Sequence, residues 1–138
     1  MIFRQLEKSD FHKNYLQLLS QLTEVGTITE EQFNNIYDNL QSTVWVYEDN
    51  GEIVASASLL VEQKFIHNGG AVGHLEDVVV NQNYRGHSLG QKIVKEIVQI
   101  AREKGCYKII ADCKHNLLGF YAKNGFEKKG EQIAIYFT

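Results

Sequence analysis

Residues 84–98 read YRGHSLGQKIVKEIV, which places two glycines and a serine directly before an amphipathic run. Glycine near the start of a helix costs stability unless something must approach the backbone closely. Free backbone N–H groups and the positive end of the helix dipole make such a junction suitable for a phosphate. We therefore interpret Gly86, Ser88 and Gly90 as part of a phosphate-binding loop. A loop that simply gives a flexible entry to the helix is the alternative.

Two well-known phosphate loops do not match this stretch. The P-loop pattern G-x-x-x-x-G-K-[ST] requires a wider spacing than that from Gly86 to Gly90, and Gln91 stands where the pattern has lysine. The dinucleotide pattern G-x-G-x-x-G is also absent, and the antiparallel strands expected upstream do not suit that fold. The phosphate expected here therefore belongs to another class of ligand.

Hydrophobic periodicity predicts the elements around the loop. The expected strands are 2–6, a hairpin over 43–63, 65–81 with a reversal near its start, a buried strand at 106–113, and one or two strands within 126–137. The expected helices run from Ser9 and Asp10 to about Leu22, onward from Thr29, from 88 to 104, and within 116–125. This order predicts an α/β (α+β) fold in which about four helices flank a mixed, mostly antiparallel sheet with one crossover helix.

Three local signals support these boundaries. Thr29 and Gln32 have the spacing of a capping box at a helix start. Asn50-Gly51 is a strong tight-turn signal within the hairpin. Gly105 directly follows the long amphipathic run, where a helix C-cap glycine is common.

The chain has 138 residues, 43% of them hydrophobic and 22% charged, and a formal net charge of -3. We expect a single domain over 1–138, with no nucleic acid or membrane as partner. No apolar run reaches the roughly 18–20 residues of a membrane span, and the first residues lack a signal-peptide pattern. Cys106 and Cys113 fall on opposite faces of one predicted strand, so we expect free thiols in a cytoplasmic protein. No cysteine and histidine spacing predicts a metal site.

The loop and a later segment together resemble the GNAT superfamily of acyl-CoA-dependent N-acetyltransferases. The superfamily's pyrophosphate motif, Arg/Gln-x-x-Gly-x-Gly/Ala, stands here as Arg85-x-x-Ser88-x-Gly90, with serine replacing the first glycine. The stretch FYAKNGF at 120–126 resembles the Tyr-x-x-x-Gly-Phe segment near the thiol end of the cofactor. The resemblance implies a GNAT fold over the whole chain, and acetyl-CoA as co-substrate.

Four further stretches resemble the eukaryotic glucosamine-6-phosphate N-acetyltransferases within that superfamily. They are LTEVGTIT (22–29), EQKFIH (62–67), GHLEDVVVN (73–81) and GCYKIIADC (105–113). The resemblance implies direct transfer of acetyl from acetyl-CoA to the 2-amino group of glucosamine 6-phosphate in a ternary complex, on the route to UDP-N-acetylglucosamine. It also implies a homodimer whose sugar-phosphate site lies near the subunit boundary.

The same resemblance assigns catalytic roles to Tyr121, Glu76 and Asp112. Tyr121 would donate a proton to the departing thiolate, although a tyrosine at helical spacing is often a packing residue. Glu76 and Asp77 would hold the sugar, with their side chains on opposite strand faces; a structural ion pair at the strand end is the alternative. Asp112 resembles the acidic residue at the active centre. The expected acetyl-CoA contacts are Val78, Val79, Val80, Arg85, Gly86, His87, Ser88, Leu89, Gly90, Gln91, Asp112, Tyr121 and Lys123.

Sugar-phosphate contacts are also implied by the resemblance, and two departures weaken them. The matching positions are Thr23, Lys64, His67, Glu76, Asp77, Tyr107 and Lys108. Many members carry a C-terminal arginine that binds the phosphate, whereas this chain has no basic residue after Lys129. Leu117 also stands where the family has asparagine. Two other functions stay open: acetylation of a different small-molecule or protein amine, and a non-catalytic acyl-CoA-binding module.

Overall fold

The structure is a computed structural model that describes residues 1–86 and 88–137. Its elements are β1 (Ile2–Gln5), the 3-10 helix η1 (Lys8–His12), α1 (Tyr15–Leu19), α2 (Glu30–Asp38), β2 (Thr43–Asp49), β3 (Glu52–Gln63), α3 (Ile66–Gly69), β4 (Ala71–Val80), η2 (Gln82–Tyr84), α4 (Leu89–Glu103), β5 (Cys106–Ile110), η3 (His115–Leu117) and α5 (Leu118–Ala122). No helix within these residues is long and apolar enough to cross a membrane.

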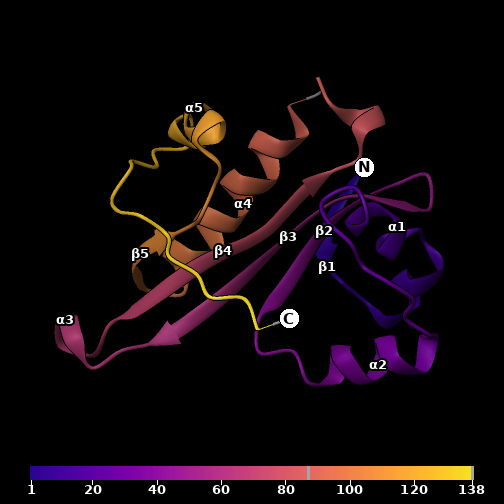
Figure 1. The fold of residues 1–138 in the computed structure, drawn as a ribbon, viewed down its shortest axis with the longest axis horizontal. Coiled ribbons are helices and arrows are strands. Elements are labelled where there is room, and N and C mark those ends of the chain that lie inside the picture. Colours follow the sequence, from indigo (N-terminus) through magenta and orange to yellow (C-terminus); the bar gives the residue numbers. More distant parts are fainter. Residues whose placement is uncertain (87, 138) are drawn as a thin grey trace.

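The strands form one sheet in the order β1-β2-β3-β4-β5. Pairing is antiparallel from β1 to β4, whereas β4 and β5 are parallel. The long helix α4 connects this parallel pair and lies along one face of the sheet (Figure 1). The predicted mixed sheet with one crossover helix is therefore confirmed.

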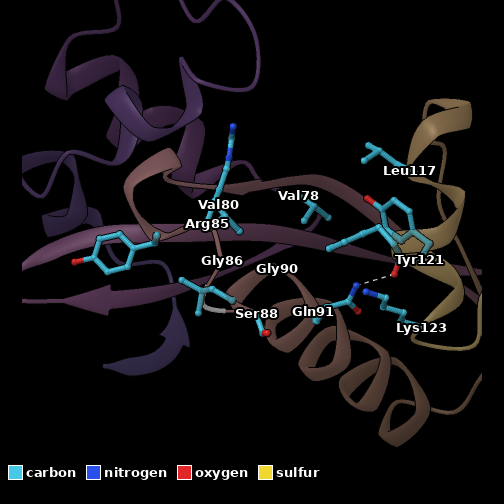
Figure 2. Close-up of a pocket in the computed structure, with 13 residues that line it drawn as sticks. Val78, Val80, Arg85, Gly86, Ser88, Gly90, Gln91, Leu117, Tyr121 and Lys123 are labelled. Atoms are coloured by element: carbon cyan, nitrogen blue, oxygen red, sulfur yellow. Dashed lines mark hydrogen bonds between the residues drawn. The ribbon is translucent and has the colours of Figure 1, made fainter.

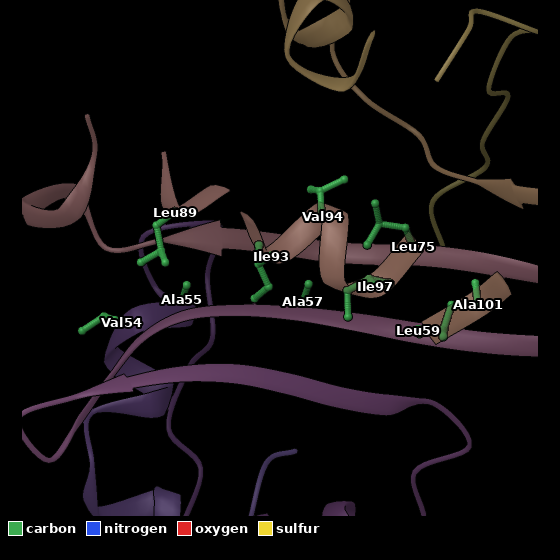
Figure 3. Packing of buried hydrophobic residues seen from close by; sticks show 10 residues of the cluster. All are labelled: Val54, Ala55, Ala57, Leu59, Leu75, Leu89, Ile93, Val94, Ile97 and Ala101. Carbon is green, nitrogen blue, oxygen red and sulfur yellow. The ribbon is translucent and has the colours of Figure 1, made fainter. Parts of the chain in front are cut away.

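Helix α4 is fixed to the sheet by buried side chains at four-residue intervals. Leu89, Ile93, Ile97 and Ala101 are all buried and face strands β3 and β4 (Figure 3). At Gly73 a Cβ atom would lie 3.3 Å from the Cβ of Ala101, so glycine allows the helix and strand to approach closely. This packing fixes the N-terminus of α4 beside the end of β4.

A second core cluster covers the other face of the sheet, under α1 and α2. Its buried members are Leu6, Tyr15, Leu18, Phe33, Val44, Val46, Ile53 and Val79. Val79 packs in this cluster, whereas its neighbours Val78 and Val80 pack against the α4 cluster. Alternation along the end of β4 therefore turns Val78 and Val80 toward α4.

The local signals around three element boundaries are confirmed. Thr29 and Gln32 form the predicted capping box at the start of α2. Asn50 and Gly51 have φ values of 51° and 78° in the hairpin turn. Gly105 has a φ of 79° and directly follows Lys104, the C-cap residue of α4.

The prediction of one helix from Ser9 to Leu22 is wrong. The segment forms the 3-10 helix η1 and the short helix α1, separated at Asn14, which has a φ of 62°. Asp10 is not the N-cap residue but the third residue of η1, where its carboxylate accepts from the backbone N–H of the N-cap residue Glu7 in a capping box. The same carboxylate accepts two hydrogen bonds of 2.8 Å from the Arg4 guanidinium. This buried ion pair fixes the segment against the sheet.

The predictions for the C-terminal third are partly wrong. Strand β5 ends at Ile110 rather than 113, and Tyr107 and Ile110 remain exposed rather than buried. Within the described residues after 126 there is no strand. Ile133, Ile135, Tyr136 and Phe137 are 80–94% exposed. The alternating pattern there identifies residues that suit a sheet, but it cannot supply the neighbouring strand that a ladder requires.

Candidate active site

A cavity of about 520 Å³ opens where β4, the loop after it, the N-terminus of α4 and α5 meet (Figure 2). It is lined by Val78, Val80, Tyr84, Arg85, Gly86, Ser88, Leu89, Gly90, Gln91, Leu117, Phe120, Tyr121 and Lys123. Most of the expected acetyl-CoA contacts are therefore gathered around one opening. Val79 and Asp112 do not line it, since Val79 faces the opposite core cluster. The expected contact His87 lies outside the described residues.

The loop presents backbone N–H groups to this cavity. Gly86 and Ser88 have φ values of 91° and 58°, and Ser88 is the N-cap residue of α4. The first intrahelical bond runs from the Lys92 N–H to the Ser88 carbonyl, so the N–H groups of Leu89, Gly90 and Gln91 precede the helical ladder. With the dipole of this 15-residue helix and the nearby Arg85, they favour an anion.

Two hydrogen bonds anchor the chain just before this loop. The Tyr84 hydroxyl donates to the Asp49 carboxylate at 2.7 Å, which links η2 to the end of β2. The Gln82 backbone N–H donates to the Gln21 side chain at 2.9 Å. The position of the loop before α4 is therefore set by contacts with parts of the chain that are distant in sequence.

Helix α5 forms the facing wall and carries Tyr121. The Tyr121 ring makes edge contacts with Phe120 and Phe126, with ring centroids 4.9 and 5.6 Å away. Burial, with a smaller contribution from Cys113, raises the pKa of the Tyr121 phenol above its ordinary value. The hydroxyl therefore stays protonated at neutral pH and can donate a proton inside the cavity.

Strand β4 is irregular beside the cavity. Ser58 pairs with Glu76 and Ser56 with Val79, so Asp77 and Val78 together face the single residue Ala57 in a β-bulge. Asp77 has a φ of 52°, and the expected regular alternation of Glu76 and Asp77 therefore fails at this point. Strand β5 pairs with β4 only as far as His74, so within the described residues no strand covers that edge of β4 beyond it.

The charges of two carboxylates act on a third, Glu76, at this irregular point. Partial burial, followed by the charges of Asp77 and Asp112, raises the pKa of Glu76 above its ordinary value. Asp112 also accepts a 3.2 Å hydrogen bond from the Gln132 side chain. A concentration of negative charge next to the bulge favours a cationic group such as an ammonium.

Part of the expected sugar-phosphate set lies near the start of β4, apart from Glu76 and Asp77, and consists of Lys64, His67, Tyr107 and Lys108. His67 stacks on Tyr107 with ring centroids 4.2 Å apart, and the Lys108 ammonium lies 5.9 Å from the Tyr107 ring. The Lys64 ammonium pairs with Glu62 at 3.3 Å. Lys108 pairs in register with Val72, and Glu76 is four residues farther along β4, or roughly 13 Å at the usual strand rise. Thr23 is exposed in the segment after α1.

Sequence reasoning missed Tyr84 and Phe120 as cavity residues. Tyr84 directly precedes Arg85 in the loop stretch, and Phe120 directly precedes Tyr121, so each adjoined a predicted contact. Leu117 also lines the cavity, at the position expected to hold asparagine. Each contributes apolar surface, and only packing of α5 against the loop reveals that these side chains face the same opening.

Comparisons with known proteins agree with this architecture. A model of the acetyltransferase (GNAT) family matches residues 3–126. Glucosamine 6-phosphate N-acetyltransferase 1 of Dictyostelium discoideum is 44% identical, over 97% of this chain and 89% of its own length. A probable glucosamine 6-phosphate N-acetyltransferase 2 of Oryza sativa subsp. japonica is 43% identical, over 97% of this chain and 86% of its own length.

Solved structures of acetyltransferases have the same fold as this chain. The crystal structure of glucosamine-6-phosphate N-acetyltransferase from Arabidopsis thaliana superposes with a TM-score of 0.96 at 38% identity, covering 99% of this chain and 98% of that one. An aminoglycoside acetyltransferase from a soil metagenome shares the fold, with a TM-score of 0.81 at 16% identity. The family match spans most of the chain, and its relatives cover nearly all of it. The chain therefore belongs to the acetyltransferase (GNAT) family.

Proposed function

We propose that this protein transfers the acetyl group of acetyl-CoA to the 2-amino group of glucosamine 6-phosphate, releasing CoA and N-acetylglucosamine 6-phosphate. Relatives bearing that activity in their names are 37–45% identical over more than 90% of the chain. The observation that carries the proposal is the cavity in which the amides of α4 and the phenol of Tyr121 face one opening. One end suits a diphosphate and the other suits a departing thiolate.

The residues present fit acetyl-CoA. The Leu89, Gly90 and Gln91 amides would hold its diphosphate, with Arg85 and Lys123 supplying positive charge. The uncovered edge of β4 from Val78 to Val80 would pair with the pantetheine amides as an added strand does. The apolar side chains along the cavity suit the carbon chain between these polar groups.

The carboxylates and Tyr121 then divide the work of the reaction. Glu76, Asp77 and Asp112 attract and orient the amine. Water first takes one proton from the ammonium, which frees the nitrogen lone pair. The amine nitrogen then forms a bond to the thioester carbonyl carbon, the carbon–sulfur bond breaks, and the nitrogen gives a second proton to water. The Val78 N–H stabilises the carbonyl oxygen as it gains charge. Tyr121 gives its proton to the thiolate.

A thiol-release assay tests the activity. We expect CoA release only when acetyl-CoA and glucosamine 6-phosphate are both present, and a much weaker signal with glucosamine, since Lys64, His67 and Lys108 would bind the phosphate. Release that does not depend on the sugar would reject the proposal. A stronger response to another amine in an acceptor panel would assign the site to a different substrate.

The variant Gly90→Glu tests the assignment of the loop. A Cβ at Gly90 would lie 3.1 Å from the Phe120 ring, and the added carboxylate would repel the diphosphate. We expect calorimetry to show CoA affinity falling at least tenfold, about 1.4 kcal/mol. Gly130→Glu is the matched control, since a Cβ there has no neighbour within 4 Å. Equal CoA affinity in both variants would contradict the loop assignment.

We also propose that the protein is a homodimer. The exposed apolar side chains of Ile133, Ile135, Tyr136 and Phe137, together with the outer edge of β5, form a surface that suits a second copy of this chain. A second copy could also bring its group of His67, Tyr107 and Lys108 toward the sugar site of the first.

Sedimentation tests the proposed dimer and should give twice the mass of the chain. Ile135→Lys with Phe137→Lys should give monomers, whereas Ile36→Lys on exposed α2 should not; a monomeric wild type would reject the dimer.

The cellular setting follows from the same proposal. We propose a cytoplasmic enzyme whose product enters the synthesis of UDP-N-acetylglucosamine. The free thiols of Cys106 and Cys113 suit a reducing compartment. Imaging of the tagged protein in its own cells would show the location.

A further inference from the structure

The side chain of Gln91 links the two walls of the cavity. Its Nε2 donates to the Phe120 carbonyl of α5 at 2.9 Å. Its Oε1 accepts from the Asn124 side-chain amide at 2.7 Å. Gln91 lies in the first turn of α4 and Asn124 two residues after α5 ends, so these bonds connect the phosphate-binding turn to the helix that carries Tyr121.

Helix α5 depends on such a link more than a longer helix would. It has five residues, none of them buried, and a helix of this length is marginal without external contacts. Backbone N–H groups of Asn124, Gly125 and Phe126 bond to the carbonyls of Tyr121 and Ala122. The Phe120 carbonyl accepts instead from Gln91, so a side chain of α4 completes the C-terminus of α5.

The packing beside this link is close. A Cβ at Gly90 would lie 3.1 Å from the Phe120 ring, so glycine allows the ring to rest on the first turn of α4. The Tyr121 ring in turn makes an edge contact with Phe120. Movement of α5 away from α4 would therefore carry Tyr121 away from the loop that holds the diphosphate.

We infer that Gln91 and Asn124 are positioning residues that hold Tyr121 at a fixed place relative to the phosphate-binding turn. The inference rests on the proposed function of Tyr121 as proton donor. Neither residue needs to touch the reacting atoms. Because the turn that binds the diphosphate also anchors α5, a cofactor seated in the loop meets a phenol already in place.

A double-mutant cycle tests this assignment. Asn124→Ala removes the 2.7 Å bond and should lower kcat about fivefold, since one hydrogen bond is worth roughly that factor. Combined with Tyr121→Phe, which alone should lower kcat roughly hundredfold, it should have little further effect. Asn39→Ala is the matched control: its amide donates to the Asn35 carbonyl at 2.8 Å on α2, and its loss should leave kcat unchanged.

A purely structural bond would give a different result. Asn124→Ala would then lower kcat by the same factor with and without Tyr121, and this outcome would overturn the inference. An unchanged kcat, or a change confined to the KM for acetyl-CoA, would overturn it as well. A Tyr121→Phe variant with full kcat would remove the role on which the inference depends.

A measurement without turnover separates the inference from the proposed function. Tyrosinate absorbance, taken as the difference between each protein and its Tyr121→Phe counterpart, follows the titration of Tyr121 alone. Burial and Cys113 raise this pKa, and Arg85 and Lys123, which line the same cavity, are kept in every variant. We expect Asn124→Ala, but not Asn39→Ala, to lower the pKa of Tyr121. An unchanged pKa would overturn the inference even if sugar acetylation were established, and a lowered one would support it even if another amine were the acceptor.

Discussion

Ser88 has a backbone conformation that residues other than glycine rarely adopt. Its φ of 58° lies in the left-handed region, at the position where the superfamily motif has glycine. A side chain there costs roughly 1–2 kcal/mol, because Cβ approaches the following carbonyl oxygen. The glycine in the motif therefore has a conformational reason, and this chain keeps the loop with serine at a cost in stability.

Replacing Ser88 with glycine should recover part of that free energy. We expect Ser88→Gly to raise the free energy of unfolding by about 1 kcal/mol and to leave CoA affinity within twofold, since the backbone amides are unchanged. Chemical denaturation and calorimetry would measure the two quantities. A less stable Ser88→Gly protein would show that the serine side chain makes a stabilising contact.

Glu76 is a second residue whose placement opposes stability. Its raised pKa means that the folded protein disfavours the ionised carboxylate. A carboxylate with a raised folded-state pKa lowers stability as pH rises past its unfolded-state pKa. Ionisation is nevertheless what an ammonium substrate requires.

We therefore expect Glu76→Gln to separate activity from stability. At pH 7 its Tm should rise, while kcat/KM for glucosamine 6-phosphate should fall about tenfold or more, the value of a hydrogen bond to a charged group. Below pH 4 the Tm values of the two proteins should converge, because Glu76 is then protonated. Thermal scans and initial rates across pH would check this, and a lower Tm at pH 7 would contradict it.

At the level of elements, helix α2 shows what a short local pattern can predict. The Thr29 hydroxyl accepts from the Gln32 N–H at 3.2 Å, and the Gln32 side chain accepts from the Thr29 N–H at 2.8 Å. These bonds depend on residues three apart, so they could be predicted without knowledge of the fold. The same holds for the Asn50-Gly51 turn and for the long apolar stripe of α4.

Loss of the Thr29 cap should have a measurable cost. Thr29→Ala should lower the free energy of unfolding by about 1 kcal/mol. Thr27→Ala, an exposed threonine just before the helix, should change it by less than half of that amount. Denaturant titration of both variants is the test, and equal effects would show that the cap contributes nothing specific.

Elements that depend on distant partners could not be predicted. The segment after β1 was predicted wrongly because Asp10 pairs with Arg4 and caps only the short helix η1, which ends before Asn14. The bulge at Asp77 depends on the register between β3 and β4, which no spacing in β4 alone records. The exposed tail at 133–137 has a strand-like pattern without a strand. For the site, sequence motifs predicted most of the residues that line the cavity. The distance between the cavity and the group of His67, Tyr107 and Lys108 could not be predicted, because it depends on how β5 pairs with β4.

Across the whole molecule, an ion network fixes the N-terminal strand to the sheet. The Asp10 side chain is 0% exposed and pairs with Arg4 at 2.8 Å, Arg4 also pairs with Glu48 at 2.7 Å, and Lys13 pairs with Glu48 at 3.1 Å. Burial alone raises the pKa of Asp10, but the bonds from Arg4 and the Glu7 N–H lower it below its ordinary value. Hydrogen bonds from Arg4 and Lys13 likewise lower the pKa of Glu48.

The network predicts how stability depends on pH. A lowered carboxylate pKa contributes stability that is complete above the unfolded-state values of about 4 and is lost as pH falls through the folded-state values. Asp10→Asn should cost about 3 kcal/mol at pH 7, since it removes the fully buried partner of Arg4 and leaves only the pair with Glu48. Asp38→Ala, which breaks an exposed pair with Lys8, should cost less than about 1 kcal/mol. Similar losses in both variants would show that burial of the network adds nothing.

The edge of β4 that β5 leaves uncovered beyond His74 has a practical consequence for handling the protein. Among the residues that the structure describes, no strand pairs with this edge of β4, so its main-chain groups can template association with other chains, and Val78 and Val80 lie beside it. A ligand seated along that edge would block such contacts and, at a hundredfold excess over its Kd, would add about 2.7 kcal/mol to the stability of the folded state. Preparations stripped of CoA should therefore precipitate sooner on storage than preparations supplied with it.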